Sequence, residues 1–204
     1  MSRSDVMELG YLVAAILFIL GLKFLSHPRT ARRGNVVAAV GMAFAIVATL
    51  ATEHMSYGWI AAGIAVGTVI GVVSARRVKM TAMPQMVALF NGVGGGAASL
   101  IAVSEYHVRA SAHVDRLDAK TAVSILFSAI VGAISFAGSL VAFGKLQELL
   151  PGRPITWPAQ KALNAAAAAA ILALAVWSAV SVSEPVLWIA AVLALAIGVA
   201  AVLP

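Results

Sequence analysis

Apolar runs recur along the whole chain, and charged residues, proline and glycine separate them at nearly regular intervals. Each run has about 20 residues, which as a helix spans the hydrocarbon core of a bilayer. Backbone polar groups must be paired in hydrocarbon, so each run is predicted to be helical. The pattern predicts an all-α polytopic transmembrane helix bundle of about seven spans. We expect these spans over residues 6–25, 35–51, 57–75, 84–104, 119–143, 161–180 and 185–203.

The composition excludes a soluble protein. Hydrophobic residues make up 62% of the 204 positions and charged residues 11%, whereas a soluble domain has about 25% charged residues. We therefore expect a single transmembrane domain over residues 1–204. The chain has no cysteine, which excludes disulfides, zinc–thiolate sites and thiol catalysis.

Positive charge is distributed unevenly between alternate connections. The connections after the first, third and fifth runs, with the residues flanking them, hold ten of the 14 Lys and Arg residues. Such residues accumulate in cytoplasmic loops, so we expect the amino terminus outside and the carboxyl terminus in the cytoplasm. Membrane orientation then explains the net charge of +6, and no nucleic-acid partner is expected.

The connection over 105–118 contains two histidines among acidic and basic residues. We predict a solvated loop with no metal, because the spacing fits no metal-binding fingerprint. His54, beside Glu53, is interpreted as a solvated residue at the membrane interface.

No Asp, Glu, Lys or Arg falls near the middle of any predicted span. Ionisable groups inside a membrane usually mark a proton or ion path. The chain is therefore either a packing scaffold, or it lines a path with neutral groups and takes the titratable residue from a partner.

Two spans contain small residues at helical spacing. Gly63, Gly67 and Gly71 recur every four residues and predict a face for close helix packing. In the fourth span, Gly92-x-Gly94-x-x-Ala97 superficially resembles a dinucleotide fingerprint. We reject that interpretation because the glycines lie inside an apolar run, without the preceding strand that the motif requires.

The polar residues of the fourth span have two interpretations. Asn91, Gly95 and Ser99 are spaced four residues apart and share one helix face. Spacing alone favours an interhelical hydrogen bond for Asn91. The alternative is that Asn91 lines a hydrated path.

The fifth span has a longer polar stripe. Ser124, Ser128, Ser135 and Ser139 lie near one face, with Gly132 among them. The hydroxyls could order water, because each both donates and accepts hydrogen bonds. Small residues for close packing are the alternative, and spacing alone favours it.

Four blocks in the same order resemble the membrane domain of the β subunit of proton-translocating NAD(P)+ transhydrogenase. They are Ala14–Ile19, Met80–Gly92, Gly138–Gln147 and Gln160–Asn164. The resemblance implies hydride transfer between NADH and NADP+, coupled to proton passage across a bacterial inner membrane. It also implies that NAD(H) and NADP(H) bind to partner domains, that this chain binds no cofactor, and that alone it is inactive. The implied partners are the α subunit or subunits, the NADP(H)-binding domain and a second copy of the complex.

The resemblance also reverses the preference between the two interpretations of Asn91, the interhelical hydrogen bond and the hydrated path. Asn91 matches a pathway position that is histidine in one branch of the family, and Ser139 matches a serine near that position. We therefore favour the hydrated path and include Ser135 and Ser99 as candidates. Because an asparagine cannot take up and release a proton, the titratable group is expected on an α-subunit helix packed against the fourth span.

One departure from the family affects the expected boundaries. The family's β membrane part continues for two more spans and a soluble NADP(H) domain, so we expect a fragment, a split gene product or a truncated chain. The alternative function is a redox-independent structural or small-solute-transport helix bundle.

Overall fold

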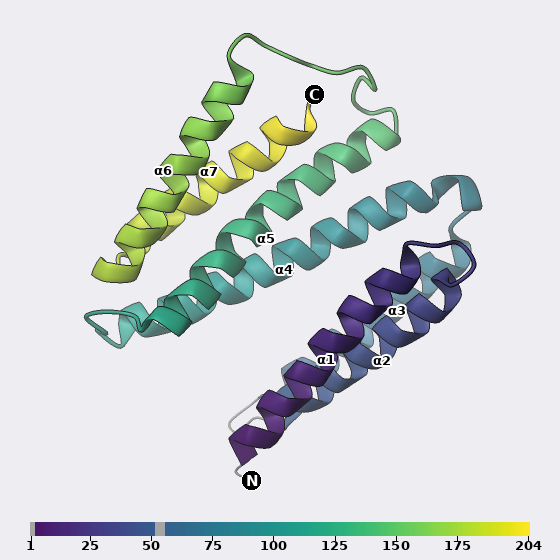
Figure 1. Cartoon of the computed structure of the whole chain (residues 1–204), viewed down its shortest axis with the longest axis horizontal. Helices are drawn as coiled ribbons and strands as arrows, with labels where there is room; N and C mark the ends of the chain where they lie inside the picture. The colour runs from purple at the N-terminus through teal and green to yellow at the C-terminus, as the bar shows by residue number, and fades with distance from the viewer. Residues whose placement is uncertain (1–2, 52–55) are drawn as a thin grey trace. The chain divides into compact units, whose positions relative to one another are not determined.

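The computed structural model describes residues 3–51 and 56–204, and the regular elements in these ranges are all helical (Figure 1). Seven helices are long and apolar enough to cross a membrane, and a short 3-10 helix, η1, precedes the fourth. The bounds are α1 Arg3–Leu25, α2 Ala31–Leu50, α3 Tyr57–Arg77, η1 Met80–Ala82, α4 Met83–Ser111, α5 Ala119–Leu146, α6 Gln160–Ser181 and α7 Glu184–Val202. The prediction of an all-α protein with seven spans is confirmed. The orientation of the termini stays a prediction.

The chain forms two compact units, one up to Val73 and one from Ser74 onward, and each is described by itself. The expected single transmembrane domain therefore stays a prediction. In the first unit, α1 and α2 pack against each other. Their backbones approach most closely at Gly21 and Gly34, where a Cβ on Gly34 would lie 2.7 Å from the Gly21 carbonyl oxygen. Glycine permits this approach because it has no side chain.

Helix α5 is the centre of the second unit. It packs against α4 and α7, and α6 packs against α7 (Figure 1). Small residues on α5, such as Ala129 and Ala133, are buried in these contacts. Lys145, in its last turn, donates hydrogen bonds to the carbonyl oxygens of Val202 at 2.9 Å and Leu203 at 2.5 Å. A cation that caps the end of a helix satisfies carbonyls left without intrahelical partners, so α5 also holds the end of α7.

Helix α4 is about two turns longer than the predicted fourth span. The structure corrects the expected loop over 105–118, because α4 continues through Ser111. Tyr106 is fully buried, and its hydroxyl donates to the carbonyl oxygen of Ser178 on α6 at 2.8 Å. Glu105 and Arg109 form an ion pair one helical turn apart. Both interactions stabilise the last turns of α4. Neither can be predicted from the length of the apolar run.

Candidate functional site

Asn91, eight residues after the start of α4, links this helix to α5. Its Nδ2 atom donates to Ser139 Oγ at 2.8 Å and to Ser135 Oγ at 3.2 Å. The two serines lie one turn apart on the same face of α5, so one amide group reaches both. We call Asn91, Ser135 and Ser139 the amide–serine cluster. The structure thus brings together three of the four residues that the sequence predicted for a proton pathway.

Close contact between the two backbones makes this geometry possible. A Cβ on Gly92, beside Asn91, would lie 3.1 Å from the Cβ of Ser139. One turn further along α4, a Cβ on Gly95 would lie 2.9 Å from the carbonyl oxygen of Gly132. Gly95 and Gly132 therefore mark a tight crossing where a larger residue would separate the helices.

The cluster has one buried side and one open side. Ser139 is 9% exposed and Ser135 is half-buried, whereas Asn91 is exposed. Both serine hydroxyls accept a hydrogen bond from the amide, which leaves the hydroxyl protons free to donate elsewhere. Among the described residues, the carbonyl oxygen of Asn91 has no recorded donor. The open edge therefore presents an acceptor on Asn91 and a donor on Ser135, both of them neutral.

Ser99 does not belong to this cluster. Its hydroxyl donates to the carbonyl oxygen of Ala129 on α5 at 2.8 Å, beyond the Gly95–Gly132 crossing. It also lines an apolar cavity of about 440 Å³ between α4, α5 and α7. In this structure Ser99 acts as a hydrogen bond between helices, and its role in a pathway stays a prediction.

The glycines of α3 have a different environment from those of α4 and α5. A Cβ added to Gly63, Gly67 or Gly71 meets no atom within 4 Å among the described residues. Their predicted role in helix packing therefore stays a prediction.

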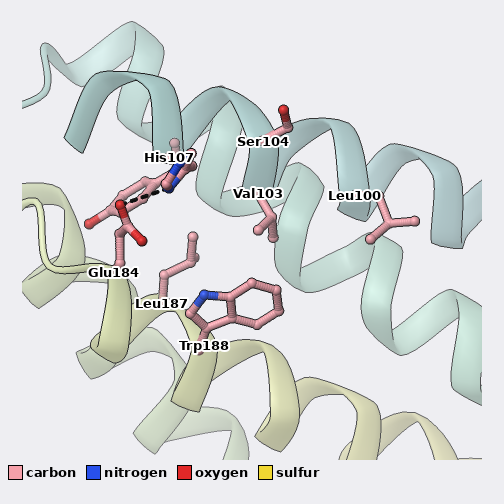
Figure 2. A pocket seen from close by; sticks show the side chains of 8 residues that line it. Leu100, Val103, Ser104, His107, Glu184, Leu187 and Trp188 are labelled. Atoms are coloured by element: carbon pink, nitrogen blue, oxygen red, sulfur yellow. Dashed lines mark hydrogen bonds and ion pairs between the residues drawn. The ribbon is translucent and has the colours of Figure 1, made fainter. Parts of the chain in front are cut away.

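Charged residues near the end of α4 form ion pairs, one with α7 and one within α4. His107 Nδ1 lies 2.9 Å from Glu184 Oε1 of α7, and Figure 2 shows these two side chains facing each other near Leu187. Glu105 Oε1 accepts from Arg109 Nε at 3.0 Å and Nη2 at 2.7 Å.

The sequence analysis missed two positions. Glu105 was assigned to a loop but lies within α4. Gln85, in the first turn of α4, donates from Nε2 to the carbonyl oxygen of Leu146 at 2.9 Å, and its Oε1 is buried without a partner among the described residues. Gln85 lies seven residues before Gly92, and this spacing could have placed it on the face toward α5. His54 and Glu53 lie outside the described residues.

The nucleotide-like glycine pattern lies inside a continuous helix. Gly92, Gly94 and Ala97 all fall within α4, which begins at Met83 with Pro84 in its first turn. Phosphate-binding glycines precede a helix and leave its first N–H groups free for the ligand. At Gly92 and Gly94 the helix is already more than two turns long, and its N–H groups are paired internally.

Comparison with known proteins identifies a family. A sequence model described as NAD(P) transhydrogenase beta subunit matches residues 7–204. Two curated relatives, both named NAD(P) transhydrogenase subunit beta and both from Rhodospirillum rubrum, are each 44% identical over 155 residues. The match covers 74% of this chain and 33% of each relative, so it spans about a third of the length of these proteins.

Proposed function

The chain belongs to the NAD(P) transhydrogenase beta subunit family, and on that premise we propose that its helices form part of a proton-translocating membrane domain. Hydride transfer from NADH to NADP+ takes place on partner domains and is coupled to proton passage through this membrane part. The chain alone transfers no hydride. Family membership favours this function over a redox-independent structural or transport bundle.

The observation that carries the proposal is the amide–serine cluster with its open edge. Asn91 donates to both hydroxyl oxygens, which leaves both hydroxyl protons free to bond to other acceptors. A hydroxyl that accepts from one side and donates to the other can pass a proton along a chain of waters. Asn91 orients this chain and does not itself exchange protons. Ser139 and Ser135 are the relay groups in this proposal.

The proposal requires a titratable group outside the cluster. We place it on a helix of the α subunit packed against the open edge of α4, beside Asn91. An ionisable side chain at that depth would have neutral hydrogen-bonding partners in Ser135, Ser139 and the Asn91 carbonyl.

The remaining partners follow from the family. The complex would contain the α subunit or subunits, the domain that binds NADP(H), and a second copy of the assembly. We place the chain in a bacterial inner membrane with its amino terminus outside and its carboxyl terminus in the cytoplasm. Gly63, Gly67 and Gly71 would form a surface on α3 for a closely packed neighbouring helix.

The test replaces Asn91 with Leu and Ser139 with Ala, singly, in the assembled enzyme in vesicles. We expect hydride transfer to lose its coupling to proton movement while the subunits still copurify. Ser181→Ala is the matched control, because Ser181 Oγ donates to Trp177 within its own helix, α6. If both variants assemble and pump protons at the control rate, the pathway assignment is wrong.

A further inference from the structure

A second polar site lies between α4 and α5, beyond the Gly95–Gly132 crossing. It is an open groove of about 360 Å³. Glu105 of α4 and Ser124 and Ser128 of α5 supply its polar atoms, and Ala98 and Ala102 supply part of its apolar wall. We call it the Glu105 groove.

The Glu105 groove and the amide–serine cluster open on the same side of the α4–α5 pair. Asn91, Ala98, Ala102 and Glu105 are separated by seven, four and three residues, a spacing that keeps them on one face of α4. Ser128 precedes Ser135 by seven residues on α5, so the serines of both sites also share a face. A proton leaving the groove along this side would therefore move toward Asn91.

The glycine crossing separates the two sites. A Cβ on Gly132 would lie 2.5 Å from the carbonyl oxygen of Gly95 and 2.8 Å from the Ser99 nitrogen. The space between the helix backbones is closed at this point, and a chain of waters cannot pass directly between α4 and α5. The two sites can communicate only along the outer side of the pair, where the proposed function places the titratable partner helix.

Glu105 is the group in the groove that can carry a proton. Its side chain is 48% exposed, and it is held by Arg109, one turn further along the same helix. Ser124 and Ser128 face it from α5, and Lys120 lies one turn before Ser124 on that helix. His107, next but one along α4, pairs with Glu184 of α7 instead. The carboxylate is therefore partly exposed and shares its groove with the two serine hydroxyls.

We propose that the Glu105 groove is a proton-access site of the pathway, with Glu105 as the group that exchanges protons with bulk water. This inference rests on the proposed function. A proton from bulk water binds the Glu105 carboxylate and breaks its ion pair with Arg109. The same proton then passes to water held by Ser124 and Ser128, and the ion pair forms again. At the end of each cycle Glu105 is again a carboxylate paired with Arg109.

The first test is Glu105→Gln in the assembled enzyme, measured in vesicles with the pH varied on the Glu105 side. We expect a several-fold lower rate of proton-coupled hydride transfer and an altered pH profile on that side only. Glu105→Asp is expected to restore the profile. Glu184→Gln is the matched control, because it removes an ion pair at the same end of the bundle but outside the groove.

A second test does not depend on the function of the Glu105→Gln variant. The chain has no cysteine, so Ser128→Cys introduces a single thiol into it. We expect a charged, membrane-impermeant methanethiosulfonate reagent to label Ser128→Cys from the Glu105 side. Ala129→Cys, at a fully buried neighbouring position, should stay unlabelled.

The outcomes separate this inference from the proposed function. An unchanged pH profile in Glu105→Gln, or no labelling of Ser128→Cys, overturns the access site. If Asn91→Leu still abolishes coupling in that case, the proposed function stands without it. If the Asn91→Leu and Ser139→Ala enzymes both pump protons normally, the proposed function is wrong, and the access site that rests on it is wrong as well.

Discussion

The helix pairs α1–α2 and α4–α5 use the same packing device but differ in what they enclose. In each pair two glycines let the backbones touch, Gly21 with Gly34 and Gly95 with Gly132. Between α1 and α2, the described hydrogen bond joins Tyr11 and Thr49 at 3.1 Å, near the end of α2.

In α4–α5, the corresponding hydrogen bonds run from Asn91, eight residues into α4, to Ser135 and Ser139, which lie at least seven residues before the end of α5. Close glycine contact is thus a general means of packing membrane helices. The two pairs differ in that both sides of the α4–α5 bonds lie at least seven residues from a helix end, whereas Thr49 is the last residue but one of α2. Three predictions test this difference, from the largest expected effect to the smallest.

The largest effect is expected from an added methyl group at each glycine contact. In Gly132→Ala the new Cβ would meet backbone atoms of α4 at 2.5 and 2.8 Å, and in Gly34→Ala it would meet backbone atoms of α1 at 2.7 and 2.8 Å. Overpacking of this kind costs roughly 1–3 kcal/mol. Both variants should therefore unfold at lower temperature in the assembled enzyme.

Only Gly132→Ala should also lose proton coupling, because it separates Asn91 from the serines. Hydride transfer and proton uptake, each measured per assembled enzyme, check this. Equal loss of coupling in Gly34→Ala would remove the distinction between the two pairs.

A smaller effect is expected from single hydrogen bonds. Ser139→Ala removes the 2.8 Å bond from Asn91, and Ser135→Ala removes the 3.2 Å bond. The shorter bond, to the more buried serine, should matter more, so coupling should fall further in Ser139→Ala. Tyr11→Phe removes the bond to Thr49. It should leave coupling unchanged and lower stability by about 0.6 kcal/mol, the average for hydrogen bonds between membrane helices.

Measurements of proton uptake and of thermal unfolding in the three variants check this order of effects. A larger loss of coupling in Ser135→Ala than in Ser139→Ala would contradict it.

The smallest effect concerns the start of α5. The Asp118 side chain accepts from the backbone N–H of Thr121 at 2.9 Å, whereas no side-chain hydrogen bond caps the start of α2 at Thr30. The bond from the Thr121 N–H holds the pKa of Asp118 below its ordinary value of 3.8. A carboxyl group whose pKa is lowered in the folded state stabilises the fold at pH values above its ordinary pKa. This stabilisation is lost as the pH falls through the lowered pKa.

Asp118→Asn should therefore unfold at a slightly lower temperature than the parent at neutral pH. The difference should shrink as the solution is acidified below the lowered pKa. Thermal unfolding across this range is the measurement. A difference between the two proteins that is independent of pH would show that the charge of Asp118 does not stabilise α5.

The spacing of glycines in the sequence did not reveal which of them make contacts. Gly63, Gly67 and Gly71 have the most regular repeat, yet added Cβ atoms there meet nothing among the described residues. Gly95 and Gly132 belong to different helices and to no shared repeat, yet their backbones touch. Spacing shows which residues share a face of one helix. It carries no information about which face of another helix lies opposite.

The sequence by itself determined the seven helices, because the length of an apolar run and the need to pair backbone groups in hydrocarbon are properties of each segment alone. The resemblance of four sequence blocks to a known family also made Asn91 and Ser139 candidates for a proton pathway, whereas their spacing alone favoured helix packing. Only the tertiary structure decided that Asn91 bonds to both Ser135 and Ser139, that Ser99 bonds to the backbone of α5 instead, and that Glu105 lies in a helix facing serines. These outcomes depend on how α4 and α5 approach each other, which is set by residues between 19 and 48 positions apart in the chain.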